Sequence, residues 1–184
     1  MEKVLIGVHG KPRAGKDTIA YYLMGKHNFV RFGPGDPVKR TAAVMFDVDI
    51  KNFYDDKLKD AMNPYWKMTH RDILQKVGKE SSRDVFGEDF WMCHIEKKLL
   101  TLPDDVPGLV LPDIRYANET HWVRDHGGLM IFVERPNRPA VADESHPAEQ
   151  GLPLELADII IPNDGTIEDL HAKIDLIVEP LIWK

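Results

Sequence analysis

Five short apolar runs are separated by longer segments with helical periodicity. The runs are residues 3–8, 28–32, 108–112, 129–133 and 157–161. None of them shows a strict alternation of apolar and polar positions, which is typical of strands that are covered on both faces. The pattern therefore predicts an α/β fold with a mainly parallel sheet and right-handed crossovers.

The segments between and after these runs predict helices, from apolar positions three or four apart or from capping residues. These helices cover 16–26, 38–46 behind an N-cap at Asp36, a segment starting at Thr69, 90–102, 118–126 and a last segment after Thr166. Residues 47–68 are polar and aromatic and predict a loop with short helical pieces. Residues 82–89 predict a turn.

The most informative stretch is residues 10–18, GKPRAGKDT, which joins the first apolar run to the first predicted helix. Glycines at its first and sixth places let backbone N–H groups point inward, as a cradle for phosphate oxygens requires. The helix N-terminus adds partial positive charge, and Lys16 can reach the outer phosphates. The stretch departs from the usual P-loop at Asp17, and a hydroxyl appears only at Thr18. It favours nucleotide binding over a glycine-rich helix cap that binds nothing.

Length and composition indicate one ordinary globular domain, since 184 residues are 43% hydrophobic and 29% charged. The net charge of −6 argues against nucleic-acid or anionic-membrane binding, and no apolar run is long enough to span a membrane. The N-terminus enters a strand almost at once, which leaves no room for a signal peptide. The single cysteine, Cys93, is expected in the core and suggests a reducing, cytoplasmic location.

Cationic residues gather where the predicted strands end, which is the edge at which open parallel sheets bind ligands. They are Lys16, Arg13, Arg115, Arg135 and Arg138. Phosphoryl transfer depends on cations positioned around the moving group, so these side chains are candidates for holding phosphates. Arg135 and Arg138 belong to a proline-rich segment that we interpret as a lid. The alternative is that both are solvated loop arginines.

Two acidic residues at the same edge are candidates for organising Mg²⁺, directly or through water. Asp113 ends a buried strand and can instead pair with Arg115. A carboxylate at Asp17 repels phosphates unless a metal or an arginine lies between them, so we expect it to organise Mg²⁺ or to position the acceptor. Its alternative role is that of a first-turn acid stabilised by the helix dipole.

Arginines on the helices between the second and third strands suggest an acceptor pocket. Arg40, Arg71 and Arg83, together with Gln75, would suit a monophosphate, which arginine grips with two hydrogen bonds. Each alone is equally explained as a surface salt-bridge residue. Trp91 can pack against a base or sugar, although core packing is the competing interpretation.

With these residues placed, the chain resembles the bacteriophage deoxynucleoside monophosphate kinases over nearly its whole length. The segments that carry the resemblance are Gly15–Thr18, Leu74–Gly78, Arg83–Trp91, Pro112–Tyr116, Val133–Pro136, His146 with Glu149–Pro153, and Asn163–Thr166. An Asp after the P-loop lysine is normal in this group, so the departure at Asp17 carries little weight. The order and spacing of these segments are more specific than any one of them.

The resemblance implies transfer of the ATP γ-phosphoryl group to a dNMP, giving dNDP and ADP, with Mg²⁺. It also implies an adenine-side loop at residues 163–166, a lid starting at Arg135, and a monophosphate site at Arg115 and residues 71–91. Asp17 and Asp113 stay the candidates for holding Mg²⁺, directly or through water. The donor residues are Gly10, Lys11, Arg13, Ala14, Gly15, Lys16, Asp17, Thr18, Arg135, Arg138, Asn163 and Gly165. The acceptor residues are Arg40, Arg71, Gln75, Arg83, Trp91, Asp113 and Arg115. Catalysis would rest on Lys16, Asp17, Arg115 and Arg135.

The predicted architecture is thus a three-layer sandwich of the P-loop NTPase type, with a five-stranded, mainly parallel sheet and helices on both faces. Residues 1–184 form one kinase domain, with a helical acceptor-binding insertion at about 47–102 and a lid at about 134–156. Another small-molecule kinase, of the phosphomevalonate or dephospho-coenzyme A type, and a non-catalytic nucleotide-binding protein are the alternatives. Base choice, deoxy preference and a homodimer stay open.

Overall fold

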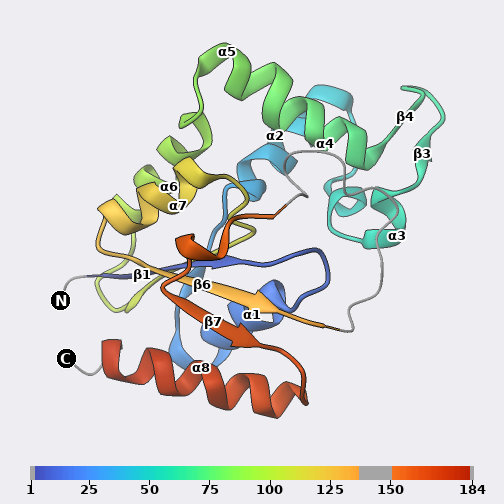
Figure 1. Cartoon of the computed structure of the whole chain (residues 1–184). Helices are drawn as coiled ribbons and strands as arrows, with labels where there is room; N and C mark the ends of the chain where they lie inside the picture. Colours follow the sequence, from blue (N-terminus) through green and yellow to red (C-terminus); the bar gives the residue numbers. More distant parts are fainter. Residues whose placement is uncertain (1–2, 137–150, 183–184) are drawn as a thin grey trace. The chain divides into compact units, whose positions relative to one another are not determined.

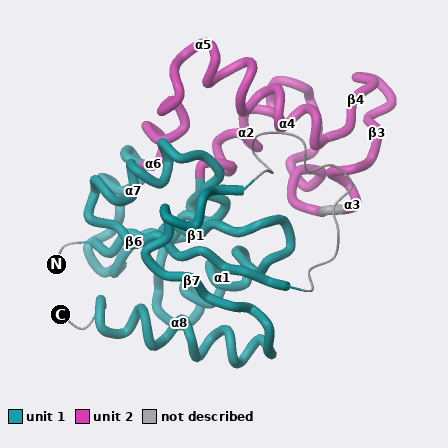
Figure 2. The backbone as a smooth tube through the Cα atoms, viewed as in Figure 1, with its two compact units in different colours: residues 1–33, 96–184 teal, residues 34–95 magenta. Residues whose placement is uncertain are grey.

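The computed structural model describes residues 3–136 and 151–182 of the chain. They form two compact units, which are coloured separately in Figure 2. Unit 1 joins Met1–Gly33 to Glu96–Lys184, and unit 2 is Pro34–Ile95. Unit 2 includes helix α2, which packs with α4, and so it starts before the helical insertion predicted at about 47–102.

Unit 1 contains the predicted five-stranded sheet, and all of its pairings are parallel. The strands are β1 (Val4–His9), β2 (Val30–Arg31), β5 (Gly108–Pro112), β6 (Leu129–Glu134) and β7 (Ile159–Pro162). Their order across the sheet is β2-β5-β1-β6-β7, with β1 in the centre. The central position of β1 places the loop that follows it in the middle of the carboxyl edge.

Helices cover both faces of this sheet, as predicted (Figure 1). Helices α1 (Lys16–His27) and α8 (Ile167–Ile182) pack on one face, where alternate residues of the strands, such as Ile6 and Val8, join one apolar core with Leu23 and Ile174. Helix α7 (Ala117–Asp125) covers the other face. There a Cβ on Gly7 would lie 2.3 Å from the Met130 sulfur, so glycine permits close packing.

Unit 2 is mainly helical. Its elements are α2 (Gly35–Phe46), η1 (Ile50–Phe53), α3 (Asp56–Lys59), β3 (Met62–Asn63), β4 (Met68–Thr69), α4 (His70–Gly78), η2 (Lys79–Arg83), α5 (Asp84–Phe86) and the start of α6 (Phe90–Leu100). Its core consists of Ala42, Phe53, Ile73, Val77 and Trp91. The predicted cap at Thr69 is confirmed, because Thr69 and Asp72 form a reciprocal capping box.

Several local predictions were wrong. Strands β3 and β4 form an antiparallel pair inside the predicted loop. Residues 79–86 continue the helix through a π-helical turn and α5, although a turn was predicted from residue 82. The widened turn is stabilised because Ser82 Oγ donates to the Val77 carbonyl and Trp91 Nε1 donates to the Gly78 carbonyl, each at 2.7–2.8 Å.

Two single-residue predictions also differ from the structure. Asp36 is not an N-cap, since α2 begins at Gly35 and Asp36 lies in its first turn. Cys93 is exposed rather than part of the core. Trp91 and Ile95 are buried on one face of α6, and position 93 lies on the opposite face of that helix. No helix in residues 3–136 or 151–182 combines the length and apolar character needed to cross a membrane.

Candidate active site

The loop between β1 and α1 has the predicted context of strand, glycine loop and helix. Gly15, directly before α1, has φ 115°, a backbone conformation in which a side chain would be strained. Arg13 also has positive φ, at 61°. The Ala14 N–H donates to the Lys11 carbonyl at 3.1 Å, and the Ala14 side chain is buried in the core. The loop is thus a tight, anchored turn.

Lys16 points back over this loop and is only 8% exposed. Its Nζ donates to the Gly10 carbonyl at 2.8 Å and to the Lys11 carbonyl at 3.1 Å. The same atom lies 3.4 Å from Asp113 Oδ1, across from the end of β5. The ammonium group is therefore held at the centre of the carboxyl edge. Its oxygen partners come from the loop after β1 and from Asp113, which follows the neighbouring strand β5.

Asp113 pairs with two cations, since Arg115 Nη2 lies 3.7 Å from the same Oδ1 that faces Lys16. Asp113 has φ 64°, which turns the chain sharply after β5. Behind it, Glu119 is 1% exposed and accepts the backbone N–H of Arg115 at 2.7 Å and of Tyr116 at 3.2 Å. Glu119 was not predicted as part of the site, although an acid three residues into a helix is a capping signal.

Asp17 lies in the first turn of α1 and is exposed. Arg31, at the end of β2, donates from Nη2 to Asp17 Oδ1 at 3.0 Å. Both earlier interpretations of Asp17 are thus compatible with its position, because it lies at a helix N-terminus and beside an arginine. The partner Arg31 was missed, since nothing local in the sequence connects it to Asp17. Thr18 is half-buried in the same turn.

The ends of β6 and β7 flank the loop on its other side. Asn163 Nδ2 donates to the Ala14 carbonyl at 2.8 Å, and the Asn163 N–H donates to the Glu134 carbonyl at 2.6 Å. Arg135 is exposed, and its Nη1 lies 3.5 Å from the Arg13 carbonyl oxygen. Gly165 leaves room for the Asp169 carboxylate, which accepts the Thr166 N–H to start α8. Arg138 and most of the predicted lid lie outside the described residues.

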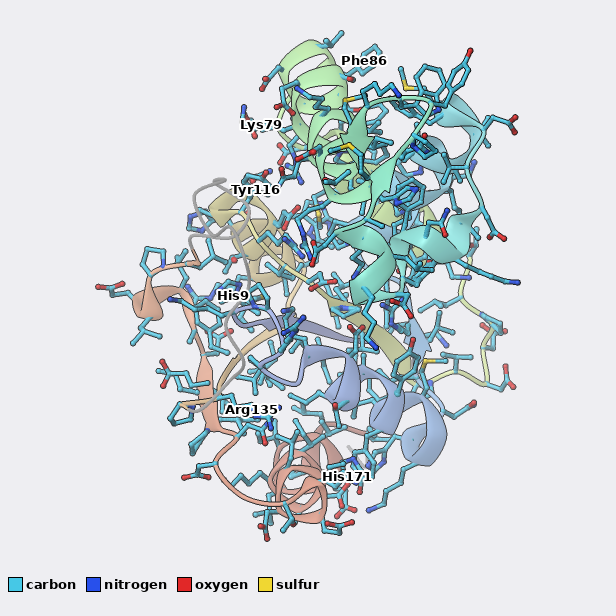
Figure 3. All side chains as sticks on the ribbon, turned by 90° about the vertical axis from the view of Figure 1, so that its right-hand side faces the viewer. His9, Lys79, Phe86, Tyr116, Arg135 and His171 are labelled. Atoms are coloured by element: carbon cyan, nitrogen blue, oxygen red, sulfur yellow. The ribbon has the colours of Figure 1, made fainter. Side chains whose placement is uncertain are left out.

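His9, labelled in Figure 3, is a buried polar residue that the sequence did not single out. It ends β1 directly before Gly10, and its Nδ1 lies 2.7 Å from the Ile114 carbonyl oxygen. Its Nε2 accepts the Leu152 N–H at 3.1 Å. A cavity of about 430 Å³ opens beside it, lined also by Phe132 and Arg135. The only signal in the sequence was a histidine at the end of an otherwise apolar strand.

The pKa of His9 lies below its ordinary value of 6.5. Burial is the largest cause, because it penalises the charged imidazolium. The hydrogen bond to Ile114 acts in the opposite direction, and the positive charges of Lys16 and Arg115 lower the pKa further. His9 is therefore a neutral imidazole at pH 7.

In unit 2, the predicted acceptor arginines have local partners. Arg71 Nε donates to Asp60 Oδ1 at 2.7 Å. Arg83 is 4% exposed and donates to the Glu88 backbone carbonyl. The salt-bridge alternative thus describes part of what these side chains do in the structure.

The remaining predicted acceptor residues of unit 2 differ in exposure. Arg40 is exposed and Gln75 is half-buried. Trp91 is 1% exposed, and its indole N–H is bonded to Gly78, so the core-packing alternative describes its position.

A further polar group in unit 2 was missed by sequence reasoning. Asp36 and Lys39 are 5% and 9% exposed, and their charged atoms are 4.0 Å apart on the first turns of α2. Tyr54 OH donates to Asp36 Oδ1 at 3.2 Å, and Lys39 Nζ lies 4.3 Å from the centre of the Tyr54 ring. This group shows that the start of α2 carries a buried ion pair.

The fold of the chain, with its five-stranded parallel sheet, is shared with solved structures. It is similar to the crystal structure of TT1252 from Thermus thermophilus, with a TM-score of 0.59 and 18% identity, over 98% of this chain and 99% of that chain. It is also similar to dephospho-CoA kinase from Campylobacter jejuni, with a TM-score of 0.54 and 15% identity, over 97% and 96% of the two chains. At these identities the likeness establishes the fold alone.

The chain belongs to the deoxynucleotide monophosphate kinase family, whose model matches residues 48–174. A protein of Acanthamoeba polyphaga mimivirus, provisionally named a deoxynucleotide monophosphate kinase, is 29% identical over 93% of this chain and 94% of its own length. The deoxynucleotide monophosphate kinase of Enterobacteria phage T4 is 23% identical over 92% of this chain and 96% of its own length. The family anticipated from the motifs is thereby confirmed.

Proposed function

We propose that the protein transfers the γ-phosphoryl group of ATP to a deoxynucleoside monophosphate, giving a deoxynucleoside diphosphate and ADP. One observation carries the proposal beyond family membership. Lys16 Nζ and Arg115 Nη2 both lie within 4 Å of the same atom, Asp113 Oδ1, at 3.4 and 3.7 Å. Lys16 is also bonded to the loop between β1 and α1, whose backbone is suited to binding phosphate. Two cations around one point on the carboxyl edge match what phosphoryl transfer requires.

In the proposed reaction, an oxygen of the acceptor phosphate bonds to the γ-phosphorus as the bond from that phosphorus to the bridging oxygen breaks. ADP leaves with the electron pair of the broken bond. Lys16 and Arg115 stabilise negative charge on the transferred group, and Arg135 acts from the end of β6. Their preorganised positions are the main contribution, since the step needs little covalent help.

The donor site consists of the loop and the two strand ends beside it. Backbone N–H groups of residues 10–18 cradle the phosphates, and Thr18 adds a hydroxyl. Asn163 and Gly165 lie beside the adenine, while Arg13 and Arg138 contribute further cations. The support for this assignment is the bond from Asn163 to Ala14, which holds the β7 loop against the phosphate loop.

Mg²⁺ fits the acidic groups of this site. Asp17 and Asp113 would hold it, directly or through water, because Mg²⁺ prefers oxygen ligands and keeps several waters. Each carboxylate already lies beside a cation, at 3.0 Å for Asp17 and 3.4 Å for Asp113, which orients it. When bound, the metal would neutralise charge on the phosphates.

The acceptor is assigned to Arg115 and to side chains of unit 2. Arg40, Arg71, Gln75 and Arg83 are proposed to bind the deoxynucleotide, and Trp91 to support their helices from the core. The two units together are proposed to act as one kinase domain, with unit 2 as its acceptor-binding part. Arg71 and Arg83 would then exchange part of their bonding to Asp60 and Glu88 for phosphate oxygens.

An assay of ADP release with a panel of acceptors tests the function. We expect release that depends on at least one dNMP, and far less with phosphomevalonate or dephospho-coenzyme A. ADP release that no acceptor stimulates would contradict the proposal and favour a nucleotide-binding protein. ADP release stimulated by dephospho-coenzyme A alone would support phosphoryl transfer but show that the acceptor is not a dNMP.

A further inference from the structure

We propose that His9 is a positioning residue of the phosphoryl-transfer site, which holds Asp113 and Arg115 in place through the Ile114 carbonyl. The inference rests on the proposed function for its kinetic consequence, but not for its structural content. His9 lies in none of the segments that carry the family resemblance. Its bonds join three parts of unit 1 that are far apart in sequence.

The first bond fixes the residue between the two charged groups of the site. His9 Nδ1 lies 2.7 Å from the carbonyl oxygen of Ile114, whose neighbours in the chain are Asp113 and Arg115. The Ile114 N–H donates to the Val8 carbonyl at 3.2 Å, so Ile114 is held to the end of β1 from both of its backbone groups. Any shift of this residue would move Asp113 and Arg115 together.

The second bond decides which ring nitrogen of His9 carries the proton. The Leu152 backbone group is an N–H and can only donate, so His9 Nε2 must be the bare, accepting nitrogen. The Ile114 carbonyl can only accept, so Nδ1 must carry the proton. Leu152 therefore enforces the tautomer that the bond to Ile114 requires.

Packing and neighbouring charges hold the His9 ring in one orientation and keep it neutral. The ring packs on Phe132 with centroids 4.6 Å apart, and the side chain is 7% exposed. The charged groups that act on it are Lys16, Arg115 and Asp113, and the two cations disfavour a further positive charge. A buried group with both nitrogens used is suited to fixing geometry rather than to exchanging protons with solvent.

Three variants separate the two bonds from the packing of the ring. His9→Phe keeps a ring against Phe132 and loses both bonds. His9→Asn can donate from its amide near the position of Nδ1 and so keep the bond to Ile114. His9→Gln can instead accept from Leu152 near the position of Nε2.

We expect kcat of His9→Phe to fall about 10- to 100-fold, because misplacement is felt in the transition state. The KM for ATP should stay within about threefold of wild type, and the KM for the acceptor should rise less than in Arg115→Ala, because Arg115 is displaced but still present. His9→Asn should recover most of kcat, and His9→Gln should not. Wild-type kcat in His9→Phe, or better recovery by Gln than by Asn, would overturn the assignment. The control is His126→Phe, which removes a comparable Nδ1 bond, at 2.8 Å to the Trp122 carbonyl, from an exposed turn and should leave kcat unchanged.

Nitrogen-15 NMR of the imidazole tests the same assignment without any substrate. We expect a protonated Nδ1 and a bare Nε2 for His9 at pH 7. A protonated Nε2 would overturn the proposal, whatever the kinetics show. If the wild-type protein released no ADP with any acceptor, the proposed function would fail, and the tautomer measurement would still decide the placement of His9.

Discussion

The two units hold their cationic side chains in different ways. In unit 1, Lys16 is bonded to backbone carbonyls of the loop and lies beside Asp113, at the ends of two paired strands. In unit 2, Arg71 and Arg83 bond to groups only eleven and five residues away in sequence. Lys16 is thus held by groups of the sheet edge, whereas Arg71 and Arg83 are held by groups that are close to them in sequence.

This difference separates two kinds of evidence for function. A lysine that is held by a glycine loop and a strand end contributes little to the stability of the fold. Its position therefore indicates that it binds a ligand. An arginine that bonds to a group of its own unit stabilises the fold whether or not it binds a ligand. The predictions below test how far this distinction holds.

The largest effect is expected for Lys16→Ala. It should lower turnover about 10³-fold, because a cation aimed at the transferred phosphoryl group is lost, while the melting temperature stays near that of wild type. Steady-state kinetics and thermal denaturation measure the two quantities. The matched control is Lys97→Ala, an exposed lysine of α6. Near-normal turnover of Lys16→Ala would refute the phosphate-clamp assignment.

Arg115→Ala should raise the KM for the acceptor about 10- to 100-fold, since arginine grips a monophosphate with two charged hydrogen bonds. The KM for ATP should change much less. Initial rates with each substrate varied in turn give both constants. Arg115→Lys keeps the charge and loses the planar fork, so it should recover only part of the affinity. Equal changes in both KM values would indicate that Arg115 belongs to the ATP site and not to the acceptor site.

Arg83→Ala and Arg71→Ala sharpen the comparison within unit 2. Arg83→Ala should destabilise the fold by about 1–3 kcal/mol, because it removes a buried side chain together with its charged hydrogen bond to the Glu88 carbonyl. Arg71→Ala should cost less than about 1 kcal/mol, since it breaks a bond to the exposed Asp60. Urea denaturation measures both. If Arg83→Ala were as stable as wild type and bound dNMP more weakly, the residue would be a ligand contact and not a structural one.

The remaining prediction, of an effect similar in size to that of Arg71→Ala, concerns the face of unit 1 where α1 and α8 meet. Asp175 accepts hydrogen bonds from Tyr22 OH at 2.7 Å, Lys26 Nζ at 2.6 Å and His27 Nε2 at 2.9 Å. Burial alone would raise the pKa of Asp175, but these bonds outweigh it and lower the pKa from 3.8 to about 2. The pair of helices should therefore be stabilised above pH 4, and this contribution should disappear as the pH falls through about 2.

Asp175→Asn should accordingly cost about 1 kcal/mol at pH 7, after allowance for solvent screening. The difference from wild type should shrink between pH 4 and pH 2, which thermal denaturation at a series of pH values measures. Asp125→Asn, an exposed acid at the end of α7, serves as the control. A difference that did not change with pH would show that Asp175 stabilises the protein through packing rather than charge.

The parts of this protein that depend on near neighbours could be predicted from its sequence. The apolar runs specify strands that are covered on both faces, and the phosphate loop lies within nine consecutive residues. Gly15 takes a positive φ that only glycine adopts without strain, so its presence indicates the turn. The capping box of Thr69 and Asp72 is equally local. In each of these features, the residues that contact one another are also close together in the sequence.

Only the tertiary structure decided which distant residues meet. His9 contacts residues 105 and 143 positions away, and Arg31 reaches Asp17 from a different strand end. These pairs depend on the order β2-β5-β1-β6-β7, because that order determines which strand ends are neighbours at the carboxyl edge. No local pattern encodes it. The sequence by itself therefore determined the phosphate loop, and the fold decided which side chains hold that loop and its neighbours in place.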